Sequence, residues 1–188
     1  YLMSPCTEHC LNLGELLFYD PILSGEKDTS CATCHHPKFG FSDGRERSIG
    51  VSGVGLGPER VFTENAHLRY FGKLEQTSRN SPTVMNLALI PDLYLDNSES
   101  GLFWDGRVIT LRQQITAPLR SRDEMKGDAI ASLDAVKEIL SRINNNKTYK
   151  NLFQKAFPLC HYYLGLNCHY YLQFHRSLYM SPIHHLVI

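Results

Sequence analysis

The sequence predicts a mainly α-helical fold with long loops. Apolar residues recur at helical spacing near the N-terminus and in the second half of the chain, and no run alternates apolar and polar residues as a half-buried strand would. Between these stretches, residues 22–60 are rich in glycine, serine and charged side chains, a composition typical of loop. With 188 residues, 43% of them hydrophobic, the chain can form one compact domain with a core.

The expected helices fall into two groups. The first group is one helix over residues 11–19, where leucines lie at helical spacing, and it ends near Pro21. Helical patterns return after Trp104, first over residues 110–119 and then after Ser132, a candidate N-cap. The apolar face of that later helix is formed by Val136, Ile139, Leu140 and Ile143. A last apolar stripe consists of Tyr149, Leu152, Phe153 and Ala156.

The long loop contains Cys31-Ala32-Thr33-Cys34-His35, the C-x-x-C-H signature of covalent haem attachment. Two thiols separated by two residues can each form a thioether with a vinyl group of the same porphyrin. The histidine that follows is then placed to bind the iron from the proximal side. The sequence therefore predicts a cytochrome-c-like haem domain with one haem c, held by Cys31 and Cys34, and with His35 as the proximal iron ligand.

Two other interpretations of the cysteine pair are weaker. A thioredoxin-like redox pair is expected within a βαβ pattern, and none is visible here. A structural zinc site needs a second ligand pair at regular spacing, for which the remaining cysteines are poor candidates. The pairing of these four cysteines is left open by the sequence: Cys6, Cys10, Cys160 and Cys168.

Charge and hydropathy exclude several classes of partner. The 19 basic and 19 acidic residues balance, so nothing indicates a nucleic-acid partner. No apolar run is long enough to form a transmembrane segment. Because haem is attached covalently outside the cytoplasm, we infer a periplasmic location, where disulfides can form.

The chain divides into three parts. Residues 1–10 are an N-terminal extension, residues 11–158 form the haem domain, and residues 159–188 form an aromatic and histidine-rich C-terminal segment. In this last part Cys-His-Tyr-Tyr-Leu occurs twice, at residues 160–164 and 168–172. The simpler interpretation is an aromatic helix that packs on the same domain, and the alternative is a second metal site or a partner-binding surface.

Several motifs accompany the haem signature in a fixed order: LGELLFYDP at 13–21, SCATCH at 30–35, FGFSDG at 39–44, RNSPT at 79–83 and FWDGR at 103–107. The next helix carries Leu111, Gln114 and Pro118, with Glu124-Met125 beyond it. Together they resemble the N-terminal haem domain of the bacterial di-haem cytochrome c peroxidase family, which includes MauG-type enzymes. The resemblance runs from about residue 11 to about residue 157.

The resemblance implies a periplasmic haem oxidoreductase that reduces hydrogen peroxide with electrons from a small redox protein, either a cytochrome c or a cupredoxin. In the family, electrons reach this haem from a second one past a tryptophan, which is Trp104 here. Arg107 would support hydrogen bonds on the haem side, and Asn80 matches a position that helps to bind calcium. The chain has no second C-x-x-C-H, so a second haem-bearing domain or chain is an expected partner.

The distal side departs from the family pattern. Leu102 and Arg112 stand where a glutamine and a glutamate are expected, although Gln113 or Gln114 could substitute in a rotated helix. Gly72 stands where some peroxidases carry a distal histidine, and the nearby His67 is a candidate distal iron ligand. His36, beside the proximal ligand, is expected at the surface or against a propionate.

The departures leave other functions open. One alternative is a non-catalytic electron-transfer cytochrome c subunit of a larger complex, with the distal face closed by His67, Met85 or a partner residue. A third possibility is a vestigial haem subunit whose aromatic C-terminal segment is an interface. Axial ligation separates the first two functions, because an open iron suits peroxide chemistry and two strong protein ligands suit electron transfer.

Overall fold

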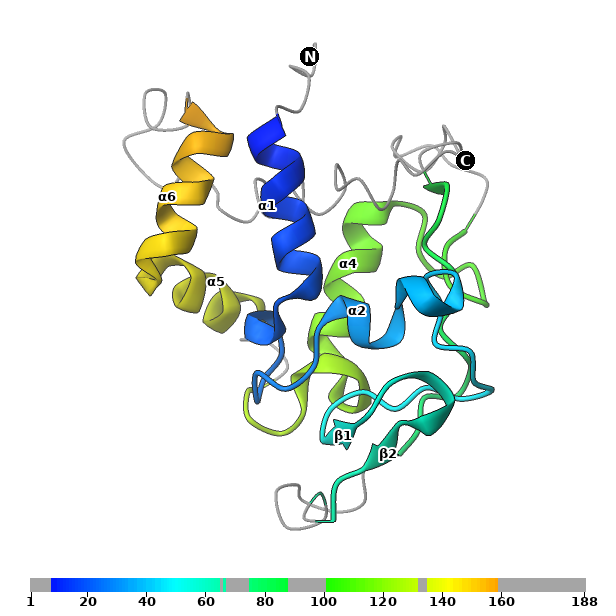
Figure 1. Ribbon diagram of the computed structural model, residues 1–188. Helices are drawn as coiled ribbons and strands as arrows, with labels where there is room; N and C mark the ends of the chain where they lie inside the picture. Colours follow the sequence, from blue (N-terminus) through cyan, green and yellow to red (C-terminus); the bar gives the residue numbers. More distant parts are fainter. Residues whose placement is uncertain (1–7, 65, 67–74, 88–100, 132–134, 159–188) are drawn as a thin grey trace.

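A computed structural model of the chain describes residues 8–64, 66, 75–87, 101–131 and 135–158. Helices dominate these residues, as predicted (Figure 1): α1 (Glu8–Tyr19), α2 (Cys31–Cys34), α4 (Leu111–Arg120), α5 (Ala135–Asn145) and α6 (Lys147–Ala156). A π-helical turn, Arg122–Lys126, follows α4. The one sheet in this part of the chain is a small antiparallel pair, β1 (Gly53–Val54) and β2 (Val61–Phe62), with Gly53 opposite Phe62.

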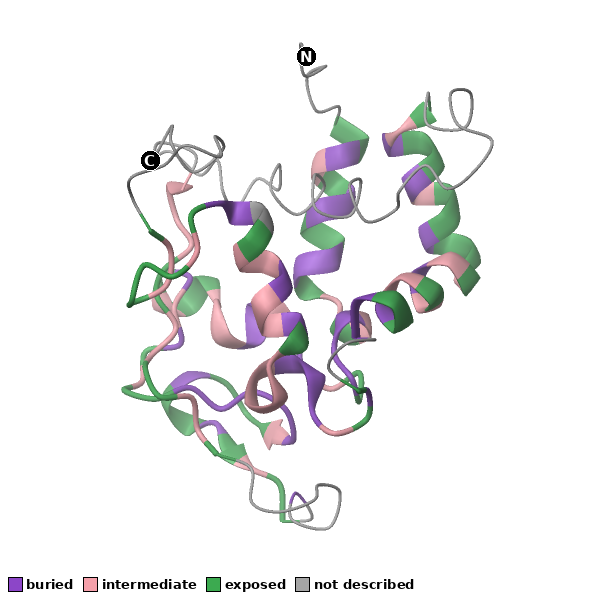
Figure 2. Cartoon of the chain, turned by 180° about the vertical axis from the view of Figure 1, so that it is seen from behind, coloured by how far each residue is buried: buried purple, intermediate pink, exposed green. Residues whose placement is uncertain are grey.

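The main core lies where α1 packs against α6, and α5 packs against both α6 and α4. Figure 2 shows buried residues along α1, α5 and α6. The buried members of this core come from each of these helices, from α4 and from the turns between them: Cys10, Leu13, Leu17, Leu23, Leu119, Met125, Ile139, Ile143, Tyr149, Phe153 and Ala156. A hydrogen bond fastens α6 to the end of α1, because the Tyr149 hydroxyl donates to Asp20 Oδ2 over 2.6 Å.

The helix predictions are confirmed where the structure describes them. α1 begins earlier than expected, at Glu8, and ends at Tyr19, just before Pro21. Thr110 caps α4, since its hydroxyl accepts a hydrogen bond from the Gln113 amide over 3.2 Å. On α5, Val136, Ile139 and Ile143 are buried and Leu140 packs partly buried against the core. The candidate cap Ser132 lies outside the described residues.

The small sheet was not predicted, and its size explains why. Each strand has only two residues, too few to show an alternating pattern. The turn between the strands contains Gly55 and Gly57, both with a positive φ, of 88° and 57°. These glycines are why the sequence predicted a loop here, and the two short strands lie within that loop.

The proposed boundaries at residues 10 and 158 stay predictions, since residues 1–7 and the segment 159–188 lie outside the described part of the chain. Cys10, in α1, is disulfide-bonded. The other three cysteines whose pairing was left open, Cys6, Cys160 and Cys168, lie outside the described residues. Among the helices that the structure describes, none combines the length and apolar character needed to cross a membrane.

Candidate haem site

The short helix α2 presents the C-x-x-C-H signature. Its two cysteines stand at i and i+3, so their side chains lie on the same face of a single helical turn. Thr33 stabilises the start of this turn, because its hydroxyl accepts a hydrogen bond from the Ser30 amide over 3.0 Å. His35 ends the turn, and its amide donates to the Cys31 carbonyl over 2.9 Å. The local fold thus brings both thiols and the imidazole to one wall of a cavity.

The imidazole of His35 is oriented by the backbone of the following loop. Its Nδ1 lies 3.3 Å from the carbonyl oxygen of Phe41, which itself is held at a positive φ of 55°. A bulky residue in this conformation is strained by about 1–3 kcal/mol, so the surrounding structure must impose it. A hydrogen bond at Nδ1 to a backbone carbonyl is typical of metal-binding histidines, which use Nε2 for the metal ion.

Burial favours the neutral form of His35. Desolvation lowers the pKa of its imidazole, although hydrogen bonds to the backbone at Phe41 and Pro82 act in the opposite direction. A neutral imidazole is the form that binds a metal ion. The surroundings of His35 therefore favour the protonation state that a proximal iron ligand needs, which is the role that the sequence predicts.

The two cysteines are half-buried. Desolvation raises the pKa of Cys31 to about 12 and that of Cys34 to about 11. A thioredoxin-like pair needs the reverse, a thiol with a lowered pKa that ionises near neutral pH. Both are free cysteines in the structure, and no group of three or more candidate zinc ligands occurs within the described residues. The raised pKa values disfavour the thioredoxin-like interpretation of the cysteine pair.

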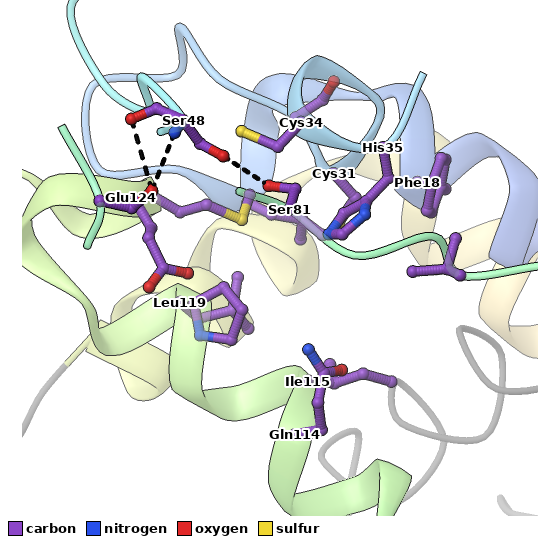
Figure 3. A pocket seen from close by; sticks show the side chains of 16 residues that line it. Phe18, Cys31, Cys34, His35, Ser48, Ser81, Gln114, Ile115, Leu119 and Glu124 are labelled. Carbon is purple, nitrogen blue, oxygen red and sulfur yellow. Dashed lines mark hydrogen bonds between the residues drawn. The ribbon is translucent and has the colours of Figure 1, made fainter. Parts of the chain in front are cut away.

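The cavity encloses about 800 Å³ of empty space, part of it open to solvent. It is lined by Phe18, Leu23, Ser30, Cys31, Cys34, His35, Ser48, Thr77, Ser81, Val84, Gln114, Ile115, Pro118, Leu119, Glu124 and Met125. Most of this lining is apolar, with a few polar groups, as in many cofactor sites. Figure 3 shows Cys31 and His35 on one side and the α4 residues Gln114 and Ile115 on the other.

Two polar residues of the cavity bear on the distal side. Gln114 on α4, which the sequence offered as a substitute, and Glu124 in the π-helical turn both line the cavity. Leu102 is not among the lining residues and instead forms a bridge with Val108. Gln114 and Glu124 both belong to the motifs that carry the family resemblance. The expected role of position 112 stays a prediction, since the side chain of Arg112 lies outside the described residues.

The carboxyl group of Glu124 is perturbed by its surroundings. Desolvation raises its pKa above the ordinary value of 4.5, and the charge of Asp123 acts in the same direction. A hydrogen bond with Ser121 and the charge of Arg107 partly oppose this shift. A carboxyl group with a raised pKa in a cavity is a typical proton carrier.

Trp104 and Asn80 lie together, outside this cavity. The indole Nε1 of Trp104 donates to the Asn80 carbonyl over 3.0 Å, and the Asn80 amide donates to Ser42 Oγ over 3.4 Å. Both line a second, open pocket, together with three arginines and two other residues: Arg45, Arg47, Arg79, Glu46 and Ser78. Asn80 is next to Ser81, which lines the first cavity.

The remaining predicted site residues lie elsewhere. Arg107 is exposed, pairs with Asp105 at 2.8 Å and lies 4.0 Å from the centre of the Phe103 ring. It is not among the residues that line the cavity. Met85 packs against Phe18, Ala32 and Phe41 and does not line the cavity either. His67 and Gly72 lie outside the described residues, as does the side chain of Arg112.

The described residues fit a covalently bound haem. Two free thiols and an oriented, neutral imidazole share one wall, and apolar residues form most of the rest. Together the helical fold and this cavity define a domain of the cytochrome c type.

The chain belongs to the di-haem cytochrome c peroxidase family, whose model, described as "Di-haem cytochrome c peroxidase", matches residues 8–178. This confirms the resemblance seen in the sequence and the cytochrome-c-like fold class. Haem c is the cofactor that this family implies.

Relatives extend beyond the peroxidases. The methylamine utilization protein MauG of Methylorubrum extorquens is 33% identical over 154 residues, which cover 82% of this chain and 33% of MauG. Cytochrome c peroxidase Ccp of Escherichia coli is 34% identical over 146 residues, which cover 78% of this chain and 24% of Ccp. The crystal structure of a MauG-like protein associated with microbial copper homeostasis matches with a TM-score of 0.62 and 25% identity, covering 96% of this chain and 41% of that one. The chain thus spans about a third of the length of the MauG relatives that it matches.

Proposed function

We propose that the chain binds one haem c and forms the peroxide-reducing part of a periplasmic oxidoreductase. One observation carries this proposal: Cys31, Cys34 and His35 line the same cavity as Gln114 and Glu124. When bound, the haem would supply an iron centre for peroxide and the exchange of electrons. The protein supplies attachment, orientation and proton transfer.

Three side chains would hold the cofactor. Cys31 and Cys34 would attach the porphyrin through thioethers, and His35 would bind the iron. The contact between its Nδ1 and the Phe41 carbonyl leaves Nε2 for that role. The hydrogen bond fixes the tautomer and the plane of the imidazole ring.

Glu124 and Gln114 provide the polar groups for the substrate. Reduction of hydrogen peroxide to two water molecules consumes two electrons and two protons, so a group must move protons between the oxygens. The raised pKa of Glu124 lets its carboxyl group exchange protons closer to neutral pH than an ordinary glutamate. The Gln114 amide can both donate and accept hydrogen bonds, which orients the peroxide.

The proposal includes partners beyond this chain. Electrons would come from a small cytochrome c or cupredoxin, by way of a second haem domain or chain and past Trp104. Calcium at Asn80 belongs to the same proposal and rests on the resemblance alone. Arg107 would act on the haem side only indirectly, through its charge near Glu124.

A second candidate function is electron transfer without catalysis. The observation that favours it is the position of Met125, a buried residue that lines the same cavity. Methionine and histidine are the axial ligands of many electron-transfer cytochromes c. If the Met125 thioether binds the iron, the distal side is closed to peroxide.

Low-temperature electron paramagnetic resonance of the ferric protein, with haem counted in the same sample, separates the two functions. A high-spin signal from one covalent haem supports peroxide reduction, because it requires an open or water-bound distal position. A purely low-spin signal that becomes high-spin in Met125→Ala supports electron transfer. Absence of covalent haem contradicts both.

Two neighbouring histidines provide a matched test of proximal ligation. His35→Ala should change the spectrum of the iron and lower the yield of haem protein. His36→Ala should change neither, because His36 caps the adjacent turn by accepting a hydrogen bond from the Lys38 amide over 3.2 Å. An unchanged spectrum in His35→Ala would show that the proximal assignment is wrong.

A further inference from the structure

Arg60 is a buried arginine whose guanidinium binds three backbone carbonyl groups. It is 5% exposed, and its guanidinium donates to the carbonyl oxygens of Ile49 (2.8 Å), Gly50 (2.7 Å) and Gly55 (2.9 Å). One side chain thereby fixes both ends of the loop that precedes and contains β1. A Cβ at Gly53 would lie 2.6 Å from its Nε, so the loop is folded tightly around the guanidinium.

This loop contacts the haem-attachment turn at one point. The Ile49 carbonyl oxygen accepts the hydrogen bond from Arg60 Nε, and Cys34 Sγ lies 3.9 Å from the same oxygen. Arg60 is therefore one backbone carbonyl away from a haem-binding thiol. The charge of Arg60 also lowers the pKa of Cys34, against the larger effect of desolvation.

The same loop also closes against the segment that carries Glu124. Gly50 is so close to this segment that a Cβ would collide with the carbonyl groups of Asp123 and Glu124. Ser48, one residue before Ile49, bonds to Thr77 and Ser81 on the cavity wall (Figure 3), over 3.0 Å and 2.9 Å. The backbone that Arg60 binds thus contacts both the turn that contains Cys34 and the turn that contains Glu124.

The charge of Arg60 has no counter-ion at close range. Its three acceptors are neutral carbonyls, and among the described residues no carboxylate lies within 4.0 Å of the guanidinium. Asp28 acts on it at longer range and already accepts a hydrogen bond from the Ser52 amide over 2.9 Å. A guanidinium remains protonated in proteins, so a positive charge persists in the interior beside Cys34.

We propose that Arg60 is a positioning residue of the haem site, which holds the loop of residues 48–55 against Cys34 and, through its charge, raises the reduction potential of the haem. The proposal rests on the proposed attachment of haem to Cys31 and Cys34. A nearby positive charge stabilises the reduced state, which carries one more electron than the oxidised state. The buried position makes this effect stronger than that of a surface arginine, because solvent screens it less.

The test measures the haem midpoint potential by spectroelectrochemistry and the melting temperature, on the full chain with haem attached. In Arg60→Gln we expect the equilibrium between oxidised and reduced haem to shift at least tenfold toward the oxidised form, which equals a fall of 59 mV for one electron. In Arg60→Lys the charge remains, so the potential should change by less than half as much while the melting temperature falls.

Arg142 offers a matched control. Arg142 also donates to two backbone carbonyl groups, those of Ser24 (2.6 Å) and Gly25 (3.0 Å). Unlike Arg60, it pairs with a carboxylate, that of Glu138, and its hydrogen bonds do not involve the Ile49 carbonyl group near Cys34. Arg142→Gln should lower the melting temperature and leave the potential unchanged. If the role of Arg60 were purely structural, Arg60→Gln would likewise lower the melting temperature and leave the potential unchanged.

Each outcome bears on the proposal. Unchanged potentials in haem-bearing Arg60→Gln would overturn it, and so would equal shifts in the lysine and glutamine variants. If Arg60→Gln forms no haem protein while Arg142→Gln does, the positioning role is supported, and the potential of Arg60→Lys then decides the role of the charge. Absence of covalent haem in the unchanged chain would overturn the proposed function itself, which the haem count shows before any variant is compared.

Discussion

The indole of Trp104 is bonded to the backbone of Asn80: its Nε1 donates to the Asn80 carbonyl oxygen over 3.0 Å. Trp104 is nevertheless 60% exposed, the largest exposed fraction among the big hydrophobic residues in the described part of the chain. Ser81, the residue after Asn80, lines the haem cavity. An exposed aromatic ring is thus fixed one residue away from the cavity wall, which is a suitable place for an electron to enter.

For Trp104→Phe we expect a small effect on stability and a large effect on electron delivery. The loss of one exposed hydrogen bond should cost about 0.5–1.5 kcal/mol. Haem content should stay the same, because Trp104 does not line the cavity. Stopped-flow reduction of the haem by a small cytochrome c should be slower. Ile109→Ala, another exposed apolar residue nearby in sequence, is the control, and equal rates in both variants would contradict the relay role.

Glu124→Gln should make the protein more stable at neutral pH. Burial raises the pKa of Glu124, so folding favours its protonated form. The associated stability is present below the unfolded pKa, near 4.5, and is lost as the pH rises through the higher folded pKa. The uncharged glutamine avoids this loss, so the gain in melting temperature should appear at pH 7 and vanish below about pH 4.5.

Asp123→Asn is the control for this measurement. Asp123 is the neighbouring carboxylate, but it accepts hydrogen bonds from Arg122 and from the Glu75 amide, each over 3.5 Å. Its replacement should not raise the melting temperature at neutral pH. A gain of equal size in both variants would mean that general charge repulsion, and not the burial of Glu124, is responsible.

Gln114→Leu and Leu102→Gln test which residues face the substrate. Gln114 lines the cavity, and Leu102 does not. Gln114→Leu should therefore lower the rate of peroxide turnover by tenfold or more, on the scale of one lost polar contact in a reaction site. Leu102→Gln should give no gain. Steady-state oxidation of a reduced small cytochrome c measures both, and a gain in Leu102→Gln would instead support the sequence-based placement of Leu102 on the distal side.

The fold was largely predictable because the helices have clear apolar faces. On α5, the spacing of Val136, Ile139 and Ile143 corresponds to the buried side. The attachment motif was predictable as well, since Cys31, Cys34 and His35 are adjacent in the chain and their chemistry depends on that spacing. Such local patterns need no knowledge of the tertiary structure.

Other features depend on contacts between distant segments. Glu124 is a functional candidate because the fold brings it to the cavity that Cys31 and His35, far earlier in the chain, also line. Arg60 looks like an ordinary charged loop residue until its three carbonyl partners are seen. The positive φ of Phe41 is unusual for a bulky residue, and no sequence signal indicates that its carbonyl would turn toward His35.

Tyr149→Phe should destabilise the helical core without affecting the haem site. The Tyr149 hydroxyl donates to Asp20 Oδ2 over 2.6 Å, and Tyr149 is 3% exposed. A hydrogen bond to a charged group contributes about 1.5–3 kcal/mol, so the free energy of unfolding at pH 7 should fall by that amount. Tyr19→Phe is the control, because Tyr19, at the end of α1 and next to Asp20, is 42% exposed. This substitution should change the free energy of unfolding by less than about 0.5 kcal/mol.

The effect of Tyr149→Phe should also depend on pH. Burial, followed by the hydrogen bond to Asp20, raises the pKa of Tyr149 above its ordinary value of 10.0. The stability that this hydroxyl contributes is complete below pH 10 and is lost as the pH rises toward the folded pKa. Urea unfolding at pH 7 and above pH 10 should therefore show a smaller difference between the two proteins at alkaline pH. A difference that stays constant with pH would contradict the raised pKa of Tyr149 in the folded protein.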